Sequence, residues 1–333
     1  MKTPLHIDSS PHINAGSSVE KIMQHVLLAL SPVVIFAIYA YGLAVLLLLV
    51  VSILSCVLSE HFFNRLSTKN QSLQDYSIIV TAVIYALTLP PGLALWMAAL
   101  GGFVCVALGK FIFGGLGANP FNPALVGRAF LQAAFPVAMT NWTPAFSADR
   151  FVSLPTSTLA WPFGKPIYDQ ISMATPLAAK KFEQIDTGVY ELALGLTSGS
   201  AGETCAVLLL AGAGYLLWKK ILKWQIPLGI FTAVILLTGM FNLIQPDVTP
   251  SPLFMLFSGG LMLGALFMAT DPVASPITAW GCFVYGIIIG MLIVIIRLWG
   301  GLPEGVMYAI LFANALSPHI DRLIQPKVFD EKS

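Results

Sequence analysis

The segment from Leu43 to Ser59 reads LAVLLLLVVSILSCVLS and contains no charged side chain. It is one of several apolar runs of roughly 17–23 residues, the length at which a helix crosses about 30 Å of hydrocarbon. Hydrophobic residues make up 57% of the 333 residues and charged residues 10%, whereas soluble domains carry about 25% charged residues. The sequence therefore predicts an all-α polytopic membrane protein.

Ten apolar runs fit this pattern when the shorter ones are included. They cover residues 24–41, 43–63, 76–90, 93–113, 122–139, 204–218, 226–244, 252–270, 277–299 and 304–320. One long hydrophilic segment divides them five and five. We therefore expect an N-terminal segment (1–23), a first five-helix repeat (24–139), a loop (140–203), a second five-helix repeat (204–320) and a C-terminal tail (321–333).

The basic residues predict the orientation, because cytoplasmic loops carry an excess of Lys and Arg. One side of the ten-helix arrangement receives eleven of them: Lys2, Lys21, Arg65, Lys69, Lys110, Lys219, Lys220, Lys223, Arg322, Lys327 and Lys332. The other side receives Arg297 and four residues of the long loop. Both termini are therefore expected in the cytoplasm of a bacterium, and the loop on the periplasmic side of the inner membrane.

The two halves of the chain share a weak internal similarity. Residues 86–90 (ALTLP) are followed by Trp96, and residues 268–272 (MATDP) are followed by Trp280. An odd number of helices in each half gives the two copies opposite orientations, as in inverted-repeat transporters. The frequency of Gly and Pro in membrane helices accounts for part of the match.

The long loop contains the sequence Asp169-Gln-Ile-Ser172-Met-Ala174-Thr175-Pro176. The proline restricts Thr175 to an extended backbone. Residue chemistry alone predicts an ordered loop with an ordinary surface threonine. The pattern Asp-x-x-Ser/Thr-x-Ala-Thr, however, resembles the motif at which flavin transferases attach FMN through its phosphate to the final threonine.

Other segments carry a resemblance that extends over the whole chain: residues 10–12 (SPH), 22–32 (IMQHVLLALSP), 117–124 (GANPFNPA) and 199–204 (GSAGET). They resemble the NqrB/RnfD family, which includes membrane components of the Rnf (Rsx) electron-transport complex and of the sodium-pumping NADH:quinone reductase. The resemblance implies a ten-helix inverted-repeat fold similar to urea transporters. It also implies a translocase assembled with Rnf subunits A, B, C, E and G and matured by a flavin transferase.

The resemblance implies electron relay through FMN joined by a phosphoester to Thr175, with Asp169, Ser172 and Ala174 as the attachment motif, coupled to Na⁺ or H⁺ translocation. The protein would not be catalytic alone. A small-solute transporter, or a scaffold with no redox centre of its own, is the alternative. The net charge of +1 gives no indication of nucleic acid, and the spacing of the four cysteines offers no metal site. Membrane lipids are expected contacts.

Polar residues inside the apolar runs form a second candidate site, since such residues are commonly functional. Asn119, Asn122, Arg128 and Asp271 could hold a second, noncovalent flavin such as riboflavin, or line an ion path. Asn119 and Asp271 could instead cap helices, and a structural or lipid-facing role is the simpler expectation for Arg128.

Two features beside the loop have alternative interpretations. The exposed amides of residues 199–204 could receive a phosphate, or the glycines could allow a tight turn in which Glu203 complements a helix dipole. Lys180 and Lys181 could favour a reduced, anionic flavin, or form a solvated basic pair.

Overall fold

The computed structural model describes residues 18–66, 75–162, 174–203, 205–246 and 249–325. Within these ranges, all regular secondary structure is helical. The first half contains α1 (Val19–Tyr41), α2 (Leu43–Leu66), α3 (Ser77–Leu87), α4 (Leu95–Val106), the π-helical turn η2 (Ala107–Phe111), α5 (Pro123–Ala134) and α6 (Pro136–Met139). The second half contains α9 (Ala206–Trp218), α10 (Gln225–Ile244), α11 (Pro252–Phe257), α12 (Leu261–Leu263), η4 (Gly264–Met268), α13 (Ala279–Trp299) and α14 (Val306–Leu323). Three short elements lie between the halves: α7 (Pro176–Ala178), η3 (Ala179–Glu183) and α8 (Val189–Leu194).

All ten predicted apolar runs contain helix. Among the described residues, four helices are long and apolar enough to cross a membrane: α1, α2, α10 and α13. The runs 76–90 and 204–218 contain only α3 and α9, with 11 and 13 residues. The all-helical membrane fold is therefore confirmed, while ten complete crossings stay a prediction.

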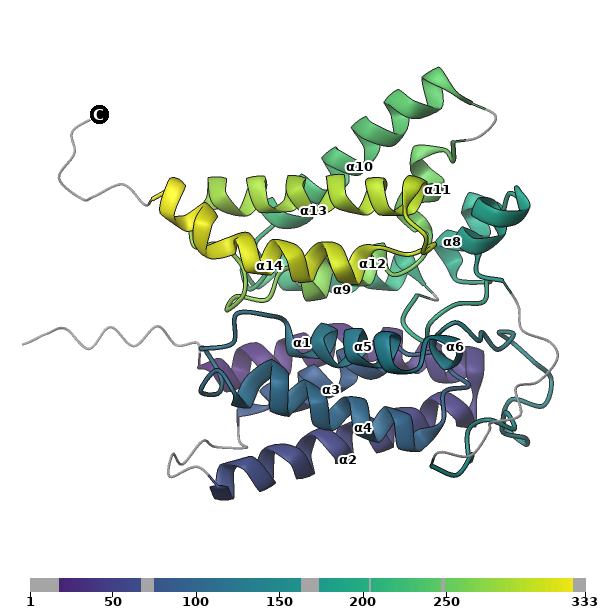
Figure 1. Cartoon of the computed structure of the whole chain (residues 1–333), viewed down its shortest axis with the longest axis vertical. Coiled ribbons are helices and arrows are strands. Elements are labelled where there is room, and N and C mark those ends of the chain that lie inside the picture. The colour runs from purple at the N-terminus through teal and green to yellow at the C-terminus, as the bar shows by residue number, and fades with distance from the viewer. Residues whose placement is uncertain (1–17, 67–74, 163–173, 204, 247–248, 326–333) are drawn as a thin grey trace, which may run out of the picture.

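The helices form two groups that pack side by side, with α1–α6 in one group and α9–α14 in the other (Figure 1). In the first group α2 packs against α3 and α4, and in the second α10 packs against α11 and α13. Contacts between α1 and α9, and between α5 and α14, join the groups.

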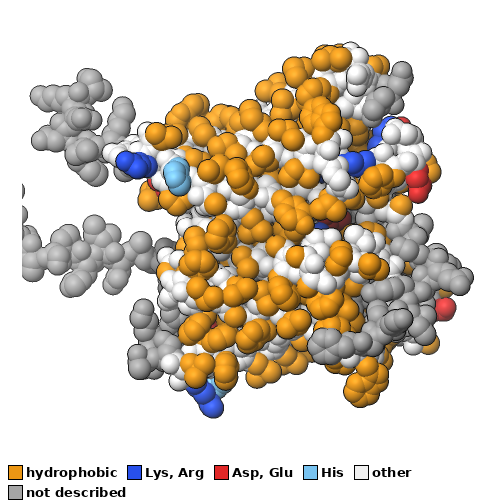
Figure 2. Space-filling view, viewed as in Figure 1, with side chains coloured by type: hydrophobic (Ala, Val, Ile, Leu, Met, Phe, Trp, Pro, Cys, Tyr) orange, Lys and Arg blue, Asp and Glu red, His pale blue; other side chains and the backbone are white. Residues whose placement is uncertain are grey.

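The two ends of the bundle differ in composition. At one end, which we call the basic end, Lys110, Lys219 and Lys220 surround one cavity. At the other, the loop end, residues 142–162 and 198–203 pack on the ends of α1 and α4: Leu43 N donates to Arg150 O (3.0 Å). Charged side chains are seen at the two ends of Figure 2 and hydrophobic ones between them.

A tight turn between α1 and α2 is enclosed by this loop. Gly42 has φ +67°, and a Cβ placed on it would lie 1.9 Å from the carbonyl oxygen of Arg150. Only glycine combines a left-handed backbone with such a close approach. The boundary that the sequence placed at residues 41–42 is therefore a true helix break.

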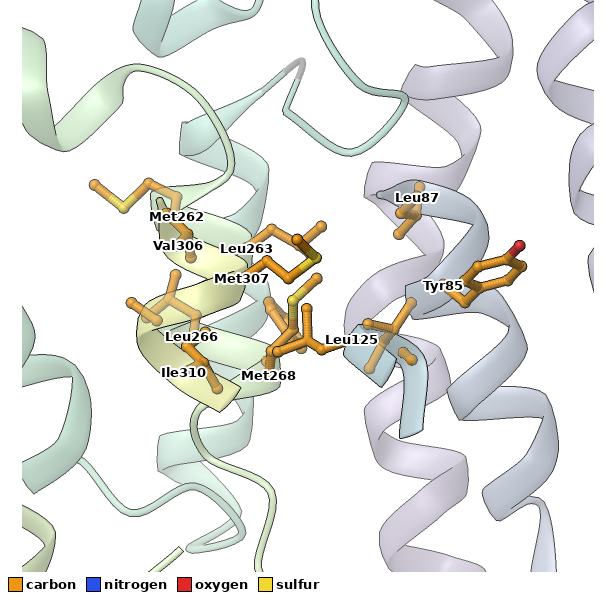
Figure 3. Close-up of a cluster of buried hydrophobic side chains, with 14 of the residues drawn as sticks. Tyr85, Leu87, Leu125, Met262, Leu263, Leu266, Met268, Val306, Met307 and Ile310 are labelled. Atoms are coloured by element: carbon orange, nitrogen blue, oxygen red, sulfur yellow. The ribbon is translucent and has the colours of Figure 1, made fainter. Parts of the chain in front are cut away.

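The junction between the two groups is apolar. Leu87 and Leu125 of the first group face Leu263, Met268 and Met307 of the second (Figure 3), and all five are buried. Backbone groups beside them are paired across the halves: Gly202 N donates to the Leu87 carbonyl at 2.6 Å. Such pairing satisfies the polar groups that short helices leave open in an apolar environment.

Candidate functional site

Thr175 begins the short helix α7. Its backbone is extended (φ −68°, ψ 154°), as Pro176 predicts, and its Oγ1 accepts a hydrogen bond from Ala178 N at 3.3 Å. The residue is 7% exposed, so the expectation of an ordinary surface threonine is wrong. Burial and capping fix the side chain in one place at the loop end.

Thr175 lines a cavity of about 420 Å³. Its wall also contains Trp142, Phe182 and Tyr308, together with Arg128 and Glu304 (we call this the Thr175 cavity). A volume in the range of ordinary ligand pockets, aromatic rings and a few charged groups are typical of a cofactor site. Ala174 is exposed beside it and also lines the cavity, while Asp169 and Ser172 lie outside the described residues.

Arg128 reaches this cavity from α5. Its Nη2 donates to Glu304 Oε2 at 3.0 Å, and the Arg128 residue is 9% exposed. The lipid-facing alternative is therefore wrong, because the guanidinium lies inside the protein. A guanidinium is the side chain best suited to a phosphate, and here it is fixed by its carboxylate.

The two lysines after Thr175 do not line this cavity; they border a separate one of about 150 Å³. Lys180 pairs with Asp186 (2.8 Å). Lys181 donates to the carbonyls of Gly300 (2.5 Å) and Leu302 (3.1 Å), at the end of α13. Burial lowers the pKa of Lys181. The prediction of a freely solvated basic pair is wrong, since both ammonium groups have protein partners.

The other polar residues predicted from the sequence gather at the opposite, basic end. Asn119, Asn122 and Asp271 line one cavity of about 460 Å³ with Lys110 and Thr270 (we call this the Asn122 cavity). The four residues of the predicted second site are therefore divided, because Arg128 belongs to the Thr175 cavity.

Hydrogen bonds assign local roles to these residues. Asn122 is the N-cap of α5: its Oδ1 accepts from Ala124 N at 3.0 Å, while its Nδ2 donates to the Met268 carbonyl at 3.1 Å. Asn119 donates to the Phe121 carbonyl, and so the expectation that it caps a helix is wrong. Asp271 accepts from Val273 N within a turn, so it caps amides, but no helix starts there.

A pair of glutamates at the junction was not predicted as a site. Glu304 Oε1 accepts from Gly260 N at 2.6 Å, and Glu203 Oε2 accepts from Ser200 N at 3.3 Å. Glu203 is thus bonded to its own turn, close to the expected capping arrangement. A carboxyl group next to an apolar run was the signal for Glu304, but its partners are distant in the sequence.

One known protein family covers nearly the whole chain. The NQR2, RnfD, RnfE family matches residues 6–330. The chain belongs to this family. Its resemblance to that family, inferred from short motifs, is therefore confirmed.

Three relatives are similar over almost the entire chain, and each is the D component of an oxidoreductase complex. The identity is 37% to that of the proton-translocating ferredoxin:NAD(+) oxidoreductase complex of Clostridium ljungdahlii, over 97% of this chain and 95% of that protein. It is 38% to that of the Na(+)-translocating ferredoxin:NAD(+) oxidoreductase complex of Acetobacterium woodii (98% and 95%). It is also 38% to that of the ion-translocating oxidoreductase complex of Stutzerimonas stutzeri (94% and 92%). Similar identity to a proton- and a sodium-translocating relative leaves both ions open.

Proposed function

We propose that this protein is the membrane-embedded D component of a redox-driven, ion-translocating ferredoxin:NAD⁺ oxidoreductase complex, and that it relays electrons through FMN joined by a phosphoester to Thr175. The proposal rests chiefly on one observation, the position of Thr175 at a cavity of about 420 Å³ with aromatic walls. The relatives' names supply the complex and its ferredoxin and NAD⁺ linkage.

The residues of the Thr175 cavity fit a flavin nucleotide. A phosphoester on Thr175 would carry negative charge, and the Arg128 guanidinium lines the same cavity. The rings of Trp142 and Tyr308 offer flat surfaces for a planar group. Bound there, FMN would supply one- and two-electron chemistry, while the protein holds it in place and limits its contact with water.

The Asn122 cavity is the proposed place of a second, noncovalent flavin such as riboflavin. It is larger, at about 460 Å³, and its wall combines apolar side chains with Asn119 and Ser77. The Asn122 side chain, however, already makes hydrogen bonds to Ala124, Leu125 and Met268. Its role toward a ligand would therefore be to hold the cavity wall in shape.

We further propose that the two groups of helices are inverted repeats. α1 runs from the basic end toward the loop end, since Ile22 borders the Asn122 cavity and Tyr41 bonds to Gly199. α9 runs the other way and ends beside Lys219. Opposite directions of the first helix in each group support an inverted arrangement.

The basic end would face the cytoplasm and the loop end the periplasm, as the positive-inside rule predicts. Rnf subunits A, B, C, E and G would be the partners, with ferredoxin and NAD⁺ served by these other proteins. A flavin transferase would attach the FMN before or during assembly.

The packed junction favours electron relay over an open solute pore. The Asn122 and Thr175 cavities lie toward opposite ends, and between them stand buried apolar residues, among them Leu125 (1% exposed) and Met268 (3%). A polar solute would have to lose its hydration to pass these side chains, which is unfavourable.

The test is in-gel fluorescence of the denatured protein, produced in cells that contain the flavin transferase. The wild-type band should fluoresce under ultraviolet light, and Thr175→Ala should abolish the signal. Thr140→Ala is the matched control, because Thr140 lines the same cavity but bonds only to carbonyls of its own helix. A dark wild-type band, or a bright Thr175→Ala band, would refute the covalent flavin. Solute flux through the reconstituted protein alone would support the transporter.

A further inference from the structure

Four charged side chains meet at the junction of the two groups of helices. Arg128 comes from α5 and Arg297 from α13, while Glu203 and Glu304 lie just before α9 and α14. They surround the turn at residues 259–260. With both carboxyl groups ionised, the four charges cancel, and any proton bound there leaves one positive charge in excess.

Glu304 has partners on both of its oxygens. Its Oε2 is 3.0 Å from Arg128 Nη2, and its Oε1 is 2.6 Å from Gly260 N. The Arg297 guanidinium is close as well: its Nη2 and Glu304 Oε1 would stand 3.1 and 3.2 Å from a Cβ on Gly259. Glu304 is therefore suited to remain an anion.

Glu203 is held differently. Its Oε2 accepts from Ser200 N at 3.3 Å, but its Oε1 is buried and has no hydrogen-bond partner among the described residues. A buried carboxylate oxygen without a donor is costly. Protonation removes this cost, because the oxygen then becomes a donor.

An acceptor for that donor is available. A Cβ on Gly260 would lie 3.3 Å from Glu203 Oε1 and 2.7 Å from Glu304 Oε1, so the two oxygens flank the same point. Two carboxyl groups in one site commonly hold a single proton between them.

A small void beside the pair provides a second observation. Ser200 is fully buried, and its hydroxyl also lacks a partner among the described residues. With Arg128, Gly260 and Glu304 it lines a void of about 10 Å³, close to the space that a single water occupies. A hydroxyl and a water beside the carboxyl groups would give a proton a way in.

We propose that Glu203 and Glu304 together bind one proton at the junction, and that its uptake accompanies the arrival of negative charge in the Thr175 cavity. Arg128 and Glu304 border both the void and that cavity, so the charge states are coupled through them. The proton comes from water and converts a carboxylate to a carboxylic acid; no electron moves at the glutamates. The remaining titratable neighbour of Glu203 is Tyr41, whose hydroxyl is bonded to Gly199. The coupling to charge in the cavity rests on the proposed flavin, whereas the proton site itself does not.

Infrared spectroscopy of the purified full-length chain tests the proton site without any flavin. At neutral pH the wild type should show the C=O band of a buried carboxylic acid, which shifts in D₂O. Glu203→Gln should remove the band, Glu203→Asp should keep an altered one, and Glu191→Gln, at an exposed position of α8, should leave it unchanged. A folded Glu203→Gln protein with the wild-type band, or a wild type without any band, would overturn the proton site.

A redox titration of the whole complex tests the coupling. The midpoint potential of the flavin at Thr175 should fall by up to about 59 mV for each tenfold drop in proton concentration in a one-electron step. Glu203→Gln should flatten this slope, and Glu191→Gln should not. An equal slope in Glu203→Gln and wild type overturns the coupling. A dark band in the gel assay refutes the covalent flavin alone and leaves the infrared result to decide the proton site.

Discussion

Replacement of Lys181 by methionine tests how the segment that carries Thr175 is held on the helical bundle. The ammonium group donates to the carbonyls of Gly300 (2.5 Å) and Leu302 (3.1 Å), with the Ile296 carbonyl at 3.5 Å. These carbonyls belong to the last turn of α13 and the residues after it, where the helix dipole favours a cation. Methionine keeps the length and apolar stem of lysine but removes every donor.

The expected loss can be worked out from these contacts. A hydrogen bond from a charged group contributes roughly 1.5–3 kcal/mol, and partial exposure of Lys181 reduces the effect. We expect about 2 kcal/mol in total, which corresponds to a roughly 30-fold increase in local opening of this segment. Lys180→Met is the matched control. The partner of Lys180, Asp186, has a side chain that is 72% exposed, so their pair is worth roughly 1 kcal/mol or less.

Hydrogen exchange followed by mass spectrometry on peptides that cover residues 174–194 measures this opening. Lys181→Met should accelerate exchange there and leave α10 and the rest of α13 unaffected, while Lys180→Met should have a small effect. Equal exchange in Lys181→Met and wild type would refute the docking role. So would an acceleration that Lys180→Met reproduces in full.

The remaining predictions concern stability, measured by thermal unfolding in detergent. Asn122→Ala should cost about 1–2 kcal/mol, because it removes the N-cap of α5 and a bond across the junction, whereas Asn119→Ala should cost less; equal losses would contradict the assignment. Gly202→Ala should cost about 1–3 kcal/mol, since the new Cβ would meet three atoms within 2.9 Å. Gly214→Ala, in open space on α9, should be neutral or stabilising, and equal effects at the two glycines would refute this account. Arg128→Met should cost roughly 3–5 kcal/mol, because it leaves a largely buried carboxylate without its ion pair; a melting temperature like that of the wild type would contradict it.

Local rules predicted several features of this fold correctly. The apolar runs located the helices because hydrocarbon-crossing segments need length and apolar character, both visible in the sequence. The proline after Thr175 set its extended backbone, as observed. The cap of α5 was assigned to Asn119 instead of Asn122, although Pro123 marks the first helical position and so identifies the residue before it as the cap.

Long-range pairing escaped the same rules. Arg128 and Glu304 are 176 residues apart, and nothing local to either indicates the other. The shortness of α3 depends on a hydrogen bond between Leu87 and Gly202, which periodicity cannot reveal. Burial of Thr175 likewise depends on residues that arrive from both halves of the chain.

The apolar junction between the Asn122 and Thr175 cavities has a consequence for the passage of charge. For the redox function we propose, an electron can tunnel through packed side chains such as Leu125 and Met268, whereas a hydrated cation is stopped by them. The junction would then work as a filter that separates the two kinds of carrier. Any ion taken through this protein would need a movement of the two groups of helices, while electrons would cross the closed state.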